Sequence, residues 1–253
     1  MAEKQRYFIE LAYDGTNYHG WQVQPNAVTV QEVLNDALFT ILREPVETTG
    51  CGRTDTGVHA RQLYAHFDFE SDKNDSTIDL IKTVSSLNAI LPDDIAVKRI
   101  LPVHVDAHAR FDAVSRSYEY HVHFEKDPFK INQSWQLRDK PDMALMNVAA
   151  KIIMEYADFS CFSKSNTQTF TNNCKITRAE WVYSGHCLVF NISADRFLRN
   201  MVRAIVGTLI QVGKKEIAPE EVRAIIESKN RSNAGTSVPA CGLYLTEVKY
   251  TYL

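Results

Sequence analysis

The sequence predicts a mixed α/β protein built from two lobes. Its 253 residues suffice for two domains of about 100–150 residues, each with a core of its own. Apolar residues switch repeatedly between the period of two that is typical of strands and the 3.6-residue spacing that is typical of helices. A stretch at residues 126–141 with two prolines separates two such halves. We therefore expect an N-terminal lobe over residues 1–126 and a C-terminal lobe over residues 127–253.

The first half predicts elements in the order β-α-β-α-β-β. Three of these four strands are expected at residues 7–13, 63–69 and 118–124, and the helices at residues 30–42 and 78–87. The first strand stops at Asp14-Gly15, which is a turn signal. Thr29 and Glu32 have the spacing of a capping box, so the first helix should begin directly after Thr29.

The second half repeats this alternation of elements. Helices are expected near residues 143–156 and 197–212, and strands near residues 175–183, 187–194 and 243–252. Both halves should therefore pack helices against a sheet.

Composition excludes several classes of protein and indicates the cellular compartment. Hydrophobic residues make up 45% and charged residues 23%, as in ordinary globular proteins, and the net charge of −3 argues against a protein that coats nucleic acid wholesale. The five cysteines lie far apart and form no C-x-x-C pair, which predicts free thiols and neither a zinc site nor a disulfide framework. The N-terminus lacks the apolar segment of a secretory signal, and no run approaches the ~20 apolar residues that cross a bilayer. We expect a cytoplasmic protein without a membrane partner.

The segment Gly50–Ala60 is the most informative motif. Three glycines bracket an Arg-Thr-Asp triplet between a predicted helix and a predicted strand, and such glycines let a backbone approach a ligand closely. The purely structural interpretation is a Gly-rich connection in which Asp55 caps a turn. A single carboxylate beside a cation in a constrained loop instead makes Asp55 a candidate nucleophile or general base.

Two further segments carry candidate functional side chains. Tyr118 lies two residues after Arg116 on an alternating strand, and it could be ordinary core or a platform on which a base stacks. Arg203 falls among apolar residues of a predicted helix, where a charge needs a partner. Its stem could be buried with the head in solvent, or it could pair with a carboxylate, for which Asp55 is the candidate.

The motifs together resemble the tRNA pseudouridine synthase A family, in the same order and over essentially the whole chain. The matching segments are Tyr13-Asp14-Gly15 with Gly20-Trp21-Gln22, then Gly52-Arg53-Thr54-Asp55-x-Gly57-Val58-His59, Arg116-x-Tyr118-x-Tyr120, Met201-Val202-Arg203, and Pro239-Ala240-x-Gly242-Leu243. The octet around Asp55 is the most specific of them.

The resemblance implies a pseudouridine synthase fold, with two α/β lobes whose strands meet in a central catalytic cleft. It also implies a homodimeric isomerase that needs no cofactor or metal and converts uridine to pseudouridine at positions 38, 39 and 40 of the tRNA anticodon stem-loop. Asp55 would be the catalytic nucleophile and Arg203 its ion-pair partner. The substrate-binding residues would be Tyr118, which stacks on the target base, Leu243, which lines the base pocket, and Arg53 and Arg116, which contact the RNA.

The reaction explains why these residue types occur together. The N1–C1′ bond must break, the uracil must turn, and a bond must form through C5, so the base has to be extruded yet retained. An ionised Asp55 could attack C1′, add to C6 or remove a sugar proton, and the sequence leaves the three routes open. A nearby arginine would keep a desolvated aspartate charged.

Rival interpretations are weaker. A glycoside hydrolase normally uses two carboxylates, and a zinc deaminase would need H-x-E followed by P-C-x-x-C. An RNA-binding module without activity would have no use for a paired aspartate. The segment 195–231 holds many Arg and Lys residues but is only mildly basic, and the scattered histidines lack the partners of a metal site.

Overall fold

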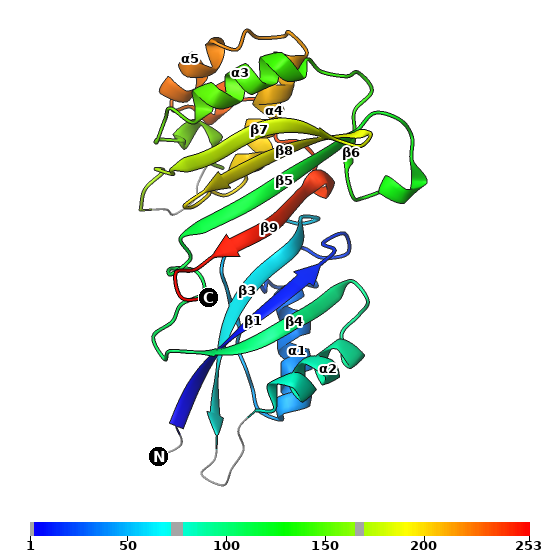
Figure 1. Cartoon of the computed structure of the whole chain (residues 1–253), viewed down its shortest axis with the longest axis vertical. Helices are drawn as coiled ribbons and strands as arrows, with labels where there is room; N and C mark the ends of the chain where they lie inside the picture. The colour runs from blue at the N-terminus through cyan, green and yellow to red at the C-terminus, as the bar shows by residue number, and fades with distance from the viewer. Residues whose placement is uncertain (1–2, 72–77, 165–169) are drawn as a thin grey trace. The chain divides into compact units, whose positions relative to one another are not determined.

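The computed structural model describes residues 3–71, 78–164 and 170–253, and Figure 1 shows the whole chain. By their internal contacts these residues form two compact units, each described by itself below. Unit 1 comprises residues 1–114 and 245–253, and unit 2 comprises residues 115–244. The first break thus lies before the predicted lobe boundary at residues 126–127, and the C-terminal strand returns to the first unit.

Unit 1 contains an antiparallel sheet with helices α1 (Val30–Leu42) and α2 (Leu80–Ile90). The strands are β1 (Glu3–Tyr13), β2 (Thr49–Gly50), β3 (His59–Ser71), β4 (Ile95–Val103) and the end of β9 (Leu243–Lys249). β1 lies between β4 and β3, and β2 pairs with β3. The predicted order of strands and helices is confirmed, with the short β2 as an addition.

The predicted helix start at Thr29 is confirmed. The Thr29 hydroxyl accepts a hydrogen bond from the backbone N–H of Glu32 at 3.3 Å, which satisfies one of the free donors of the first turn. Arg43 ends the helix in a left-handed conformation with φ +63°.

Both faces of β1 are buried. Phe8, Ile9 and Leu11 are completely covered, although adjacent residues of a strand point to opposite faces. The ring of Phe8 packs edge-on against Tyr250 and Tyr252, with centroids 5.2 Å and 6.2 Å away. The C-terminal segment of the chain therefore covers one face of this sheet.

Unit 2 contains strands β5 (Ser115–His123), β6 (Trp135–Gln136), β7 (Ile176–Ser184) and β8 (Cys187–Ala194). β8 pairs antiparallel with β5 and β7, and β6 runs parallel to β5. Helices α3 (Met143–Ile153), α4 (Met201–Gly213) and α5 (Glu221–Glu227) gather on one side of these strands, where α3 packs on β7 (Figure 1). The mixed α/β class is confirmed in both units.

Three predicted boundaries in this half are wrong by several residues. Helix α3 ends at Ile153, before the predicted Tyr156. Helix α4 begins at Met201 rather than near Phe197, because Asn200 takes a left-handed conformation with φ +66° that a helix cannot include. The last strand ends at Lys249, before the predicted Tyr252. The sequence interpretation also missed the seven-residue α5, because so short a helix has little periodicity of its own.

Every helix in the described part of the chain is too short or too polar to cross a membrane.

Candidate active site

Asp55 lies in the loop that joins β2 to β3 in unit 1. Its side chain is half-buried, whereas Arg53 is exposed. The Asp55 carbonyl accepts a hydrogen bond from Val58 N at 3.1 Å, which closes a tight turn, and Gly57 has a φ of +75° within it. The neighbouring Thr54 is buried, and its hydroxyl lies 2.8 Å from the hydroxyl of Tyr13. The loop thus presents Asp55 from a backbone that is held on both sides of it.

The loop after β1 packs against the Asp55 loop and supports it. A Cβ on Gly15 would lie 2.0 Å from the carbonyl oxygen of Val58, so only glycine fits there. Gly20 has a φ of +87°, and a Cβ on it would lie 2.3 Å from the carbonyl oxygen of Thr54. The same Thr54 oxygen accepts a hydrogen bond from Trp21 N at 3.3 Å. These contacts explain why the Asp14-Gly15 and Gly20-Trp21 segments accompany the Asp55 motif.

Trp21, in the loop after β1, is buried against neighbouring residues. It is 1% exposed, and its ring lies over that of Tyr13 with centroids 6.4 Å apart. Gly50 approaches it so closely that a Cβ would lie 2.5 Å from Trp21 Nε1. Trp21 therefore serves the packing of these loops.

His59 connects the two loops. The ring is 2% exposed, and Nδ1 accepts a hydrogen bond from Gly15 N at 3.1 Å and lies 3.0 Å from Asp14 Oδ1. The next element, β3, begins at this residue. His59 therefore has a structural environment at the base of the Asp55 loop. Within the described residues, no three side chains suited to a metal ion are grouped together.

Tyr118 lies on β5 of unit 2 and is half-buried. Its ring meets Phe197 edge-on, with centroids 5.1 Å apart and planes at 87°. Phe197 lies in the segment before α4, so the late start of that helix allows it to reach β5. On the same strand, Arg116 Nη1 donates to the carbonyl of Asp195 at 2.9 Å. Sequence reasoning missed Phe197 as the neighbour of Tyr118.

Arg203 lies near the start of α4 and is half-buried. Its Nε donates to the carbonyl of Val238 at 2.7 Å, and Val238 N donates back to the carbonyl of Arg203 at 3.3 Å. The guanidinium therefore contacts the segment that precedes Leu243.

The segment 235–243 docks against α4 and β5. Gly235 N donates to the hydroxyl of Thr208 at 2.9 Å, and the Tyr120 hydroxyl donates to the carbonyl of Pro239 at 2.7 Å. Burial raises the pKa of Tyr120 above its ordinary value, so this hydroxyl keeps its proton. Leu243, at the end of the segment, is 6% exposed. We name residues 235–243 the pocket loop.

Each unit thus assembles its own part of the predicted site. Unit 1 holds Arg53 and Asp55 in the loop between β2 and β3, and unit 2 binds Arg203 to Val238 of the pocket loop, which ends at Leu243. The docking of that loop could not be read from its composition, because small residues alone fit many connections.

Comparison with known proteins agrees with this distribution of motifs. A family model described as tRNA pseudouridine synthase matches residues 11–112 and 154–251, which include Asp55, Arg203 and Leu243. A tRNA pseudouridine synthase A of Parabacteroides distasonis is 50% identical over 246 residues, which cover 97% of this chain and 96% of that protein. The proteins of that name from Bacteroides fragilis and Exiguobacterium sibiricum are 49% and 38% identical, each over 97% of this chain and at least 96% of their own lengths. By the extent of these matches, the chain belongs to the tRNA pseudouridine synthase family and is an isomerase.

Proposed function

We propose that this enzyme converts uridine to pseudouridine at positions 38, 39 and 40 in the anticodon stem-loop of tRNA. The observation that carries the proposal is the contact between the Asp55 loop and the loop after β1. There, Gly15 and Gly20 approach the backbone of the Asp55 loop so closely that no larger residue would fit. Relatives named tRNA pseudouridine synthase A that match almost end to end support the choice of substrate. A tRNA substrate also supports the expected cytoplasmic location.

Asp55 is proposed as the nucleophile. Its ionised carboxylate would attack C1′ or C6 of the uridine or remove a sugar proton, and in each route the N1–C1′ bond breaks with its electrons passing to the uracil. After the base turns, C5 bonds to C1′ and loses its proton, so the product is an isomer of the substrate. Neither an oxidant nor a second substrate is required for this balance.

Arg203 is proposed as the ion-pair partner of Asp55. A guanidinium near a carboxylate that is shielded from water favours the charged form of that carboxylate. Arg203 Nε donates a hydrogen bond to the Val238 carbonyl. The same bond would fix the direction in which the side chain extends.

The remaining residues are proposed to hold an extruded base. Extrusion costs a few kcal/mol, which stacking on an aromatic ring and burial against an apolar wall offset. Tyr118 would supply the ring, and Leu243 the wall. Arg53 is exposed and Arg116 half-buried, so both could contact the phosphates of the displaced nucleotide.

A homodimer is also proposed, on the family resemblance. Light scattering on the purified protein tests it, and a mass near the 28.8 kDa of one chain would contradict it.

The decisive experiment measures pseudouridine in an unmodified tRNA with uridines at the three positions. Wild type is compared with Asp55→Asn, and the product is mapped by carbodiimide treatment and primer extension. Asp36→Asn, at an exposed carboxylate on α1 of the same unit, is the matched control. We expect product from wild type and the control but none from Asp55→Asn. Folded wild type that binds the tRNA without forming product would instead indicate an RNA-binding module.

Arg203→Met tests the ion pair. We expect activity to be abolished while the circular dichroism and melting temperature stay close to wild type. Near-normal turnover by a folded Arg203→Met protein would contradict the proposed role.

A further inference from the structure

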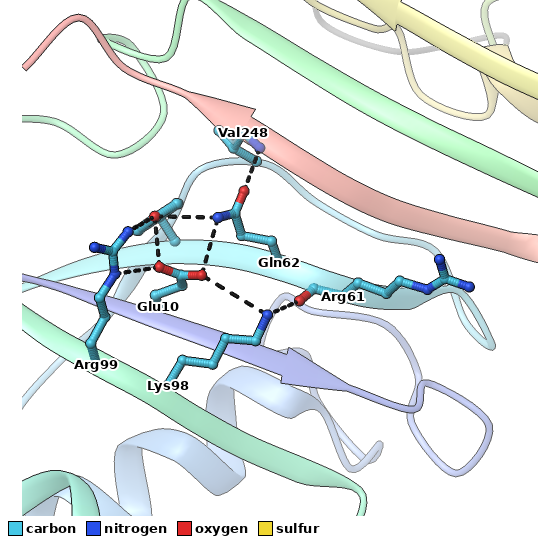
Figure 2. A network of polar contacts seen from close by, with 7 residues as sticks. Glu10, Arg61, Gln62, Lys98, Arg99 and Val248 are labelled. Atoms are coloured by element: carbon cyan, nitrogen blue, oxygen red, sulfur yellow. Dashed lines mark hydrogen bonds and ion pairs between the residues drawn. The ribbon is translucent and has the colours of Figure 1, made fainter. Parts of the chain in front are cut away.

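Two β-bulges flank β1 at the same level in unit 1. Between β1 and β4, Glu10 pairs with Arg99 but Leu11 pairs with Val97, so Lys98 is the extra residue on β4. Between β1 and β3, Leu11 pairs with Leu63 but Tyr13 pairs with Ala60, which leaves an extra residue among Arg61 and Gln62. Bulges redirect side chains that strict alternation would send to opposite faces. The adjacent residues Lys98 and Arg99 consequently both turn toward Glu10 (Figure 2).

Glu10 is the centre of the resulting network. It is 6% exposed, and its carboxylate accepts hydrogen bonds from Arg99 Nε at 2.6 Å, the Tyr64 hydroxyl at 2.7 Å and Gln62 Nε2 at 3.1 Å. Burial alone would raise the pKa of Glu10, but these three donors outweigh it and hold the pKa below its ordinary value. A charged carboxylate is therefore fixed beneath the two cations.

The cations on this carboxylate face outward. Lys98 and Arg99 remain 47% and 51% exposed, while Lys98 Nζ donates to the Arg61 carbonyl at 2.6 Å and lies 4.0 Å from Glu10 Oε1. Arg99 uses Nε on Glu10 and Nη2 on Tyr64. A guanidinium has five N–H donors, and within the described part of the chain the others on Arg99 meet no acceptor.

The network is also tied to its surroundings. Gln62 Oε1 accepts a hydrogen bond from Val248 N on β9 at 2.9 Å (Figure 2). The amide of Gln62 thus joins Glu10 to a third strand. Cations held in this way lose less conformational entropy on binding an anion than free surface lysines and arginines do.

We propose that Lys98 and Arg99, positioned by Glu10, bind a backbone phosphate of the RNA substrate outside the target nucleotide. The inference rests on the proposed function and extends it to a residue set that the family motifs do not include. Figure 2 shows the Arg61 side chain extending away from Glu10, so Arg61 takes part in the network through its backbone carbonyl.

The Lys98–Arg99 site and the Asp55 loop are close enough for one RNA molecule to contact both. Tyr13 ends β1 and touches Thr54, the neighbour of Asp55, and at a rise of about 3.4 Å per residue Glu10 lies about 10 Å from it along the strand. B-form DNA advances about 3.4 Å per nucleotide of one strand and an A-form RNA stem somewhat less, so this distance corresponds to about three to four nucleotides. The phosphate is therefore expected within a few nucleotides of the target uridine.

Glu10 acts as a positioning residue, which leads to opposite expectations for its substitution. Glu10→Gln makes the protein more positive by one charge, so attraction by net charge alone would strengthen RNA binding. Loss of the carboxylate that orients Arg99 and Lys98 should instead weaken it. The sign of the change distinguishes orientation from bulk charge.

The test is the salt dependence of tRNA binding, followed by fluorescence anisotropy with unmodified tRNA and full-length protein. We expect Lys98→Met and Arg99→Met each to weaken binding about five- to tenfold and to reduce the slope of log K against log salt by about one. Glu10→Gln should also weaken binding. The controls are Arg178→Met and Glu180→Gln, which change an exposed pair at 2.7 Å on β7 by the same charges and should have smaller effects.

Wild-type affinity and slope in folded Lys98→Met and Arg99→Met proteins would overturn the proposal, as would tighter binding by folded Glu10→Gln. Should Glu10→Gln fail to fold, the two exposed cation variants decide. Because the test measures binding, the phosphate site can fail independently of the proposed activity. A wild-type protein that forms no pseudouridine contradicts the activity. Normal pseudouridine formation together with unchanged tRNA binding by the variants contradicts the phosphate site only.

Discussion

Replacing Gly207 with alanine sets two physical effects against each other inside α4. Gly207 lies in the middle of the helix, where alanine is favoured over glycine by about 1 kcal/mol. A Cβ at this position would, however, lie 1.9 Å from the carbonyl oxygen of Thr236 in the pocket loop. Helix propensity therefore predicts a more stable protein, and packing predicts a less stable one.

The geometry decides in favour of packing. The atom in the way belongs to the backbone, so no side-chain rotation relieves the contact, and the pocket loop must move away from the helix by about 1 Å. That movement would stretch the bond from Gly235 N to the Thr208 hydroxyl, now 2.9 Å, which is buried. Overpacking of this kind costs about 1–3 kcal/mol, and the lost hydrogen bond adds about 1 kcal/mol. The gain of about 1 kcal/mol in helix propensity offsets part of this cost, so we expect a net destabilisation of about 1–3 kcal/mol.

Urea unfolding and pseudouridine formation measure the two consequences. Gly207→Ala should lower the free energy of unfolding, and because Leu243 and the acceptor of Arg203 belong to the displaced loop, kcat should fall by up to about a hundredfold. Gly52→Ala is the control for stability, since a Cβ there would meet nothing within 4 Å. A Gly207→Ala protein as stable as wild type, with normal kcat, would refute the reasoning.

Two other predictions concern unit 1. Tyr13→Phe removes the hydroxyl that lies 2.8 Å from Thr54 Oγ1, so we expect about 1 kcal/mol less stability and a larger fall in kcat than change in KM; unchanged kinetics would show that this contact does not support Asp55. His66 is 7% exposed, and burial lowers its pKa to about 4, below the ordinary value of about 6.5, so the folded state binds its proton more weakly than the unfolded state. The stabilisation is complete above about pH 6.5 and is lost as the pH falls toward about 4, with a loss of about 2 kcal/mol at about pH 5. His66→Gln should remove this dependence in unfolding experiments between about pH 7 and pH 5, and equal slopes for both proteins would contradict the assignment.

The local pattern of residues was sufficient for most elements. The helix after Thr29 and the strands around Tyr118 and Cys187 appear where periodicity and capping chemistry predict them, since hydrogen bonding and amphipathic burial act over a few residues. The late start of α4 escaped prediction, because the left-handed conformation of Asn200 is one of several that asparagine tolerates and tertiary contacts select among them.

By itself, the sequence determined the class of fold, the candidate nucleophile and the family, because period, glycine spacing and an ordered set of motifs are properties of the chain. Tertiary structure decided what those motifs rest on. Val58 and Thr54 explain Gly15 and Gly20 only once the two loops are in contact. Likewise, Lys98 and Arg99 share a carboxylate only because a bulge shifts the register of β4 against β1. Such close approaches and register shifts depend on residues far apart in the chain, and no local pattern encodes the distance between them.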